Sequence, residues 1–149
     1  MKKLNFLVLC LISFSVLADI SSNLEIEKAF ARSAIKDQRN SAVFMHISNK
    51  GSDAALVRAS SDAAKVVELH THVNDSGVMR MRKIDKIDLP AGQKVVLKPG
   101  GLHVMFIGLN RDLNVGESVD VDLEFSDGSH KQITAPIHKV MMKHGMKGH

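Results

Sequence analysis

The stretch Ser118-Val-Asp-Val-Asp-Leu-Glu-Phe125 decides the fold class of this chain, because apolar and polar residues alternate along its whole length. Successive side chains of a β-strand point to opposite faces of the sheet, so residues two apart share a face. The apolar residues of the stretch therefore lie together on one face: Val119, Val121, Leu123 and Phe125. The alternation predicts a strand with one buried side and one solvent-facing side.

Similar short apolar runs recur along the chain with little helical periodicity, and clusters of Gly, Pro, Asn and Ser separate them. We expect strands at 24–31, 42–48, 55–60, 65–73, 78–84, 94–97, 102–109, 118–125 and 131–137. One helical turn with a serine cap is predicted within Ser60-Ser-Asp-Ala-Ala-Lys65. This many short strands in one small domain predict an all-β, antiparallel Greek-key sandwich or barrel.

Residues 1–18 have the features of a secretory signal peptide. Lys2 and Lys3 precede an apolar run over 4–17, and Val16-Leu-Ala18 supplies small residues for cleavage. Cleavage leaves a domain at 19–137 and a flexible His/Met-rich tail at 138–149, so we expect a periplasmic protein without a membrane span. An uncleaved anchor is one alternative. Lipidation at Cys10 is another, although apolar residues continue past it.

Charge and cysteine content exclude several classes of function. Cys10 is the only cysteine, so the mature chain has neither a disulfide nor a thiolate ligand. Removal of Lys2 and Lys3 lowers the net charge from +4 to +2, and the tail carries three lysines and no acid. The body is then near −1, and the chain has no Trp or Tyr. Nucleic-acid binding is therefore not expected.

Histidine and methionine gather in two places that could meet. We expect a hairpin around 74–77 in which Val73 pairs with Val78. This register makes three facing pairs on one side of the hairpin: His70 with Met81, His72 with Met79, and Glu68 with Lys83. Directly opposed side chains lie close enough to hold one ion between them.

His103 and Met105 lie two apart on another predicted strand, so they also share a face. The residues between and beside them, Leu102, Val104 and Phe106, are expected to enter the core. The preceding Pro99-Gly-Gly101 turn can deliver His103 to the rim of a barrel. The four predicted ligands are His70, Met81, His103 and Met105. Thioethers are soft and uncharged, so this set favours Cu(I) in a compartment where thiols oxidise.

Other residues of these types have simpler interpretations. Met79 is expected to fill the core, His46 to be structural and His130 to be exposed. His72 stays open, because its face is right but it could support a ligand or contact the tail. The tail candidates for binding additional copper, as Cu(II), are His138, Met141, Met142, His144, Met146 and His149. Adventitious metal binding is the alternative for the tail.

The spacing of the four ligands is specific, with ten residues between His70 and Met81 and twenty-one between Met81 and His103. Flanking runs include Val67-Glu-Leu-His70, Gly77-Val-Met-Arg-Met-Arg82 and Leu97-Lys-Pro-Gly-Gly-Leu-His-Val-Met105. With this spacing, the chain resembles the periplasmic copper chaperone PCu(A)C family over about 24–137. It departs from the common pattern at Phe30, where tryptophan is frequent, and at Thr71, where some members carry methionine.

The resemblance implies a cupredoxin-like β-barrel that binds one Cu(I) through the four matching residues. It also implies delivery of copper for cytochrome c oxidase assembly, to subunit II or its copper-assembly factors. Extensions like this tail bind an additional copper, often Cu(II), in some members. We expect a monomeric, non-enzymatic carrier.

Three other functions compete with this interpretation. Copper storage or detoxification would use the same ligands. A blue-copper or zinc enzyme is disfavoured, because the mature chain lacks a thiolate and Glu68 is the only acid on the predicted face. A metal-free interaction module would keep its full function after His103→Ala.

Overall fold

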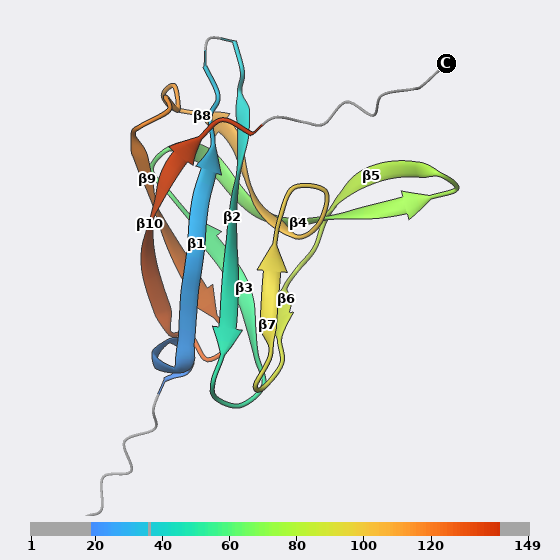
Figure 1. Cartoon of the computed structure of the whole chain (residues 1–149), viewed down its shortest axis with the longest axis vertical. Coiled ribbons are helices and arrows are strands. Elements are labelled where there is room, and N and C mark those ends of the chain that lie inside the picture. The colour runs from blue at the N-terminus through green and yellow to red at the C-terminus, as the bar shows by residue number, and fades with distance from the viewer. Residues whose placement is uncertain (1–18, 36, 141–149) are drawn as a thin grey trace, which may run out of the picture.

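The computed structural model describes residues 19–35 and 37–140. These residues form ten strands and one short 3-10 helix (Figure 1): η1 (Ile20–Asn23), β1 (Leu24–Arg32), β2 (Asn40–Asn49), β3 (Ala54–Ser60), β4 (Ala64–Asp75), β5 (Val78–Lys83), β6 (Ile87–Leu89), β7 (Lys94–Leu97), β8 (His103–Leu109), β9 (Ser118–Phe125) and β10 (His130–His138). The predicted all-β class is confirmed.

The strands form one sheet in the order β5-β4-β8-β2-β1-β10-β9-β3-β6, and β7 also pairs with β2. β5 and β6 stand at the two ends of this order, so the sheet is not closed. The strand pairs are antiparallel except β1 with β10, which run parallel. Figure 1 shows the β4–β5 hairpin projecting sideways from the body of the sheet.

The core lies inside the curved sheet and follows the predicted alternation. The four apolar residues of β9 are at most 2% exposed: Val119, Val121, Leu123 and Phe125. On β8, Val104 and Phe106 are fully buried as expected. Burial of these side chains fixes which face of β8 turns inward and leaves the alternate residues for another surface.

One local prediction was wrong, and one short strand was missed. No helical turn forms within 60–65, where β3 runs directly into a turn at Asp62 and Ala63 and then into β4. The Ser61 hydroxyl accepts a hydrogen bond from the Ala63 amide at 3.3 Å and so supports that turn instead of a helix. The short strand β6 was not expected. Its three residues pair with β3, and Ile87 and Leu89 are buried.

The register of the β4–β5 hairpin also differs from the prediction. Asp75 pairs with Val78, so the loop has only two residues, Ser76 (φ 52°) and Gly77 (φ 86°). Positive φ at both loop positions is the requirement of a type I′ turn, whose twist matches that of the strands. The tighter loop moves the pairing by two residues and leaves each side chain on its predicted face.

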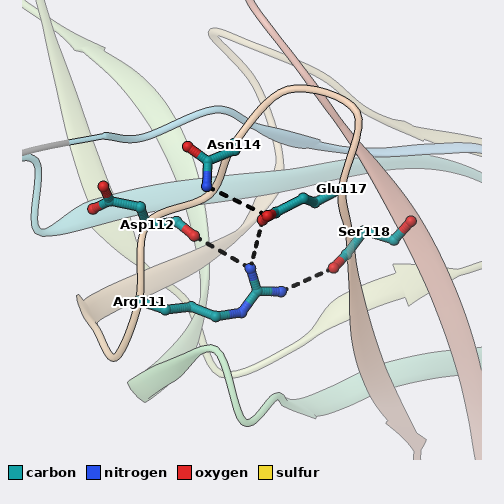
Figure 2. A network of polar contacts seen from close by, with 5 residues as sticks. All are labelled: Arg111, Asp112, Asn114, Glu117 and Ser118. Atoms are coloured by element: carbon teal, nitrogen blue, oxygen red, sulfur yellow. Dashed lines mark hydrogen bonds and ion pairs between the residues drawn. The ribbon is translucent and has the colours of Figure 1, made fainter.

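The connection between β8 and β9 is held by Arg111 (Figure 2). Its guanidinium donates to the Glu117 carboxylate at 2.9 Å, to the Ser118 carbonyl at 2.9 Å and to the Asp112 carbonyl at 3.2 Å. Asn114 also reaches Glu117, at 3.4 Å. A planar guanidinium can satisfy several acceptors at once, so Arg111 holds the polar part of this loop, while Leu113 is fully buried in the core.

No helix among residues 19–35 and 37–140 has the length and apolar character needed to cross a membrane. The predicted signal peptide lies outside the described residues, so the boundary at Ala18 stays a prediction. β10 extends to His138, one residue past the predicted strand.

Candidate metal centre

A cavity of about 320 Å³ opens between the β4–β5 hairpin and the Pro99–Gly100 turn. Three of the four predicted ligands line it, namely Met81, His103 and Met105, and His72 lines it as well. Apolar walls come from Ala42 and Phe44 of β2. His70, the fourth predicted ligand, is not among the lining residues and is paired with His103 across β4 and β8. The cavity therefore joins imidazoles and thioethers from β4, β5 and β8.

His103 forms the floor of the site. It begins β8 and is only 2% exposed. Its Nδ1 lies 2.9 Å from the Gly101 carbonyl oxygen, and that oxygen can only accept a hydrogen bond. Nδ1 must therefore carry the hydrogen, which leaves Nε2 with a free lone pair in the neutral ring. Burial lowers the pKa of His103 and thus favours the neutral ring that a metal requires.

The two thioethers sit at different depths. Met105 is on β8, two residues beyond His103, and it is half-buried between Glu68 of β4 and Ala42 of β2. Met81 is on β5 and is 44% exposed, at the outer edge of the cavity. The Met105 side chain therefore lies deeper in the protein, and the Met81 side chain lies near solvent.

His70 is held by the carboxylate of a neighbour on β4. Its Nε2 lies 2.8 Å from the Glu68 carboxylate, which also accepts a hydrogen bond from Lys83 at 2.9 Å. These two hydrogen bonds, that of His70 first, hold the pKa of Glu68 below its usual value. Among the described residues, the His70 Nδ1 is the one buried side-chain nitrogen or oxygen without a hydrogen-bond partner. Such an orphaned lone pair suits a ligand that is absent from the protein alone.

The corrected hairpin register changes the partners of these residues. His72, not His70, lies opposite Met81, and His70 lies between Lys83 on β5 and His103 on β8. The ring centroids of His70 and His103 are 5.7 Å apart, and those of His72 and His103 are 5.3 Å apart. Glu68 still reaches Lys83, although the two are not directly opposed. The sequence pattern placed the histidines and methionines of the hairpin on one face, but the cross-strand partners predicted for them were wrong.

Within the described ranges, no three His, Cys, Asp or Glu side chains form a metal-binding group by themselves. The histidines alone thus do not make a site of the kind that zinc prefers. The cavity instead places two methionine sulfurs beside imidazoles, which is a donor set typical of soft metals.

The remaining candidates lie elsewhere. Met79 is 56% exposed on β5, so the expectation that it fills the core was wrong. His46 is half-buried on β2, and His130 is exposed as expected. His138 ends β10 and stacks on Phe30, with ring centroids 5.7 Å apart. The other tail candidates lie outside the described residues: Met141, Met142, His144, Met146 and His149.

Comparison with known proteins gives consistent matches over this domain. A family model described as "Putative lipoprotein LpqE-like" matches residues 24–137. "Putative lipoprotein Lxx21020" of Leifsonia xyli is 34% identical over 119 residues, which cover 78% of this chain and 70% of that protein. "Uncharacterized protein RP573" of Rickettsia prowazekii is 33% identical over 100 residues, which cover 66% of this chain and 55% of that protein.

Solved structures with the same fold are also found. The copper-bound PCuAC domain from PmoF2 has a TM-score of 0.67 and 21% identity, and the match covers 79% of this chain and 94% of that one. The solution structure of CuI-DR1885 from Deinococcus radiodurans has a TM-score of 0.63 and 29% identity, covering 81% and 83%. These matches confirm the predicted cupredoxin-like fold.

Proposed function

This chain belongs to the LpqE-like family, the family of the PCu(A)C domains, and we propose that it is a copper chaperone that carries Cu(I). The observation that carries the proposal is the cavity itself. It brings two methionines, Met81 and Met105, next to the buried His103. The ring of His70, whose Nδ1 is orphaned, has its centroid 5.7 Å from that of His103. The copper named in the two solved PCuAC-type structures supports the same choice of metal.

The proposed ligands are His70, Met81, His103 and Met105. Uncharged thioethers and neutral imidazoles stabilise Cu(I) more than Cu(II) or Zn(II), because they are soft or borderline donors without negative charge. His103 supports this, since burial favours the neutral ring and the hydrogen bond from Nδ1 to the Gly101 carbonyl leaves Nε2 available. The apolar walls formed by Ala42 and Phe44 reduce the access of water to the ion.

The geometry favours a carrier over a catalyst. Met81 is exposed at the mouth of the cavity, so the ligands of a recipient can approach the ion from that side. A site without thiolate binds Cu(I) less strongly than a cysteine site would, which allows transfer to a stronger acceptor. Glu68, the acid beside His70, does not supply a free base, because its carboxylate is hydrogen-bonded to His70 and Lys83.

We propose that the recipient is cytochrome c oxidase subunit II or one of its copper-assembly factors, and that the protein acts in the periplasm. The putative lipoprotein among its relatives supports export. Copper storage or detoxification is the second candidate, since it would use the same cavity. Incubation of the copper-loaded protein with the apo soluble domain of subunit II, followed by separation and metal analysis, distinguishes the two. Delivery predicts transfer, and storage predicts retention.

The tail is proposed to bind additional copper, as Cu(II). Val140, the last described residue, lines the same cavity as His103 and Met81. The chain therefore leaves the described domain at the cavity, and tethered His and Met donors there would have a high effective concentration. Imidazole nitrogen is a favourable donor for Cu(II).

A Cu(I) competition titration under anaerobic conditions tests the proposed site. The protein without the predicted signal peptide, residues 1–18, is compared with two variants. One combines His103→Ala and Met105→Ala. In the other, which we call the tail-substituted chain, alanine replaces Met141, Met142, His144, Met146 and His149. We expect one tight equivalent that survives tail substitution and is lost in the double variant. Binding that disappears with the tail and ignores the double variant would contradict the proposal.

A further inference from the structure

His72 occupies the place in the cavity that the sequence spacing suggested for His70. It lies on β4 directly opposite Met81, with which it forms a facing pair across the hairpin. Both residues line the cavity together with His103 and Met105. His70, two residues earlier on the same face, is turned toward Glu68. Two imidazoles and two thioethers therefore face the same space without a contribution from His70.

The hydrogen bond of His72 orients its ring in a way that agrees with its position in the cavity. Its Nδ1 lies 3.3 Å from the Gly101 carbonyl oxygen, the oxygen that also accepts from His103 at 2.9 Å. A carbonyl oxygen only accepts, so Nδ1 carries the hydrogen in both rings and Nε2 holds the lone pair. Metal-binding histidines typically donate their other N–H to such an acceptor. One backbone carbonyl thus orients both rings in the same way.

We propose that His72 is a copper ligand of this protein, binding through Nε2. This inference rests on the proposed function and adds a donor outside the four-ligand set. His72 and Met81 then form the outer pair, on the hairpin, while His103 and Met105 form the inner pair, on β8. Because the outer pair belongs to a projecting hairpin, it is the pair that an incoming or leaving ion meets first (Figure 1).

The three imidazoles are distinguishable by the nitrogen that each leaves free. His72 and His103 present Nε2, whereas His70 is held through Nε2 by Glu68 and presents Nδ1. Long-range proton–nitrogen NMR on protein with ¹⁵N-labelled histidine reports each ring nitrogen separately, and Cu(I) is diamagnetic. On addition of one equivalent of Cu(I) to the tail-substituted chain, we expect the His72 Nε2 signal to move while its Nδ1 stays protonated.

Affinity gives a second readout with a matched control. His72→Ala should weaken Cu(I) binding by about tenfold or more, as for removal of a contributing donor. His46→Ala removes a half-buried histidine on β2 outside the cavity and should leave the affinity unchanged. An unmoved His72 Nε2 signal beside moving His103 and His70 signals would overturn the inference and leave the proposed function standing. If no histidine signal moves, both fail.

Discussion

At the scale of single residues, each imidazole around the cavity is held by one nitrogen and leaves the other free. Gly101 holds His103 and His72, and Glu68 holds His70. These hydrogen bonds fix the orientation of the rings before any ion arrives, so binding has less ordering to impose. Glu68 makes a second contact of this kind, because it also forms an ion pair with Lys83 on the neighbouring strand.

Glu68→Gln tests this positioning role. The amide keeps the size of the side chain but loses the charge that strengthens the hydrogen bond to His70. We expect Cu(I) affinity to fall by about tenfold. This is the lower end of the loss in metal affinity that is typical when a group supporting a ligand is removed. Anaerobic competition with a chromophoric chelator measures it, and circular dichroism checks that the fold is unchanged.

Lys83→Gln is the control for that variant. It removes the charge on the far side of Glu68 but leaves the 2.8 Å contact between Glu68 and His70 available. We expect it to change affinity by less than about threefold, since an exposed ion pair contributes little. Equal losses for the two variants would show that charge near the site, and not orientation of His70, accounts for the effect.

At the scale of elements, the β4–β5 hairpin decides where Met81 lies relative to His103. β5 is a terminal strand of the sheet, and every one of its residues is exposed. Packing therefore contributes little to its register, and the Ser76–Gly77 turn sets it. Space is not the constraint at Gly77, because an added Cβ would meet no atom within 4 Å. The constraint is its positive φ.

Two substitutions in this turn should have opposite effects. Gly77→Ala forces a left-handed conformation on a residue with a Cβ, at a cost of about 1 kcal/mol. Ser76→Asn places a residue that tolerates positive φ before Gly77 and should stabilise the type I′ turn. Hydrogen exchange in β5 measures both. We expect faster exchange for Gly77→Ala and slower exchange for Ser76→Asn. Changes in the same direction would show that the turn does not control the hairpin.

The hairpin also marks the limit of what the sequence could predict about the site. The period-two pattern placed His70, His72, Met79 and Met81 on one face, and the structure keeps them there. It could not choose between a four-residue and a two-residue loop, because both preserve that face. The partner of each ligand depended on that choice. The roles of Glu68 and the Gly101 carbonyl depend on backbone geometry that no residue pattern reveals.

At the scale of the whole molecule, polar contacts join segments far apart in the sequence. The Asp127 carboxylate in the β9–β10 turn accepts hydrogen bonds from the Ile20 amide at 2.7 Å and from Ser129. Lys131 donates to the carbonyls of Ser21 and Leu24. Together these contacts fasten η1 and the start of β1 to β10 at the end of the sheet. The cavity mouth lies elsewhere, beside Val140.

The Asp127 contacts should make part of the stability depend on pH. Hydrogen bonds from the Ile20 amide, and then from Ser129, lower the pKa of Asp127 below its ordinary value of 3.8. A lowered pKa stabilises the folded state above the unfolded pKa, and this contribution is lost as the pH falls through the folded pKa. The wild-type protein should therefore exceed Asp127→Asn in stability at about pH 6, and the difference should shrink at about pH 3.

Urea unfolding at the two pH values measures that difference. Asp85→Asn is the matched control, because Asp85 is exposed and has no side-chain hydrogen bond within the described part of the chain. It should show no comparable change with pH. A difference for Asp127→Asn that stays constant from about pH 6 to about pH 3 would contradict the assigned role of the ionised carboxylate.

The overall architecture was more predictable than the site. Short apolar runs between turn residues identified nine of the strands, and two of them, at 94–97 and 118–125, have the predicted bounds. β6 was missed because three residues are too few to show a period. The parallel pairing of β1 with β10 could not be predicted from the residue pattern either, because these segments meet only after the sheet has curved. Burial of alternate residues, which drives the fold, is what the sequence shows most directly.

The central claim is that Cu(I) is held by both sulfur and nitrogen donors in the cavity on β4, β5 and β8. X-ray absorption spectroscopy of the tail-substituted chain, loaded with one equivalent of Cu(I), tests it most directly. We expect sulfur and nitrogen neighbours together around the copper, with less sulfur after Met81→Ala or Met105→Ala. Copper surrounded only by nitrogen and oxygen, or unaffected by either methionine substitution, would contradict it.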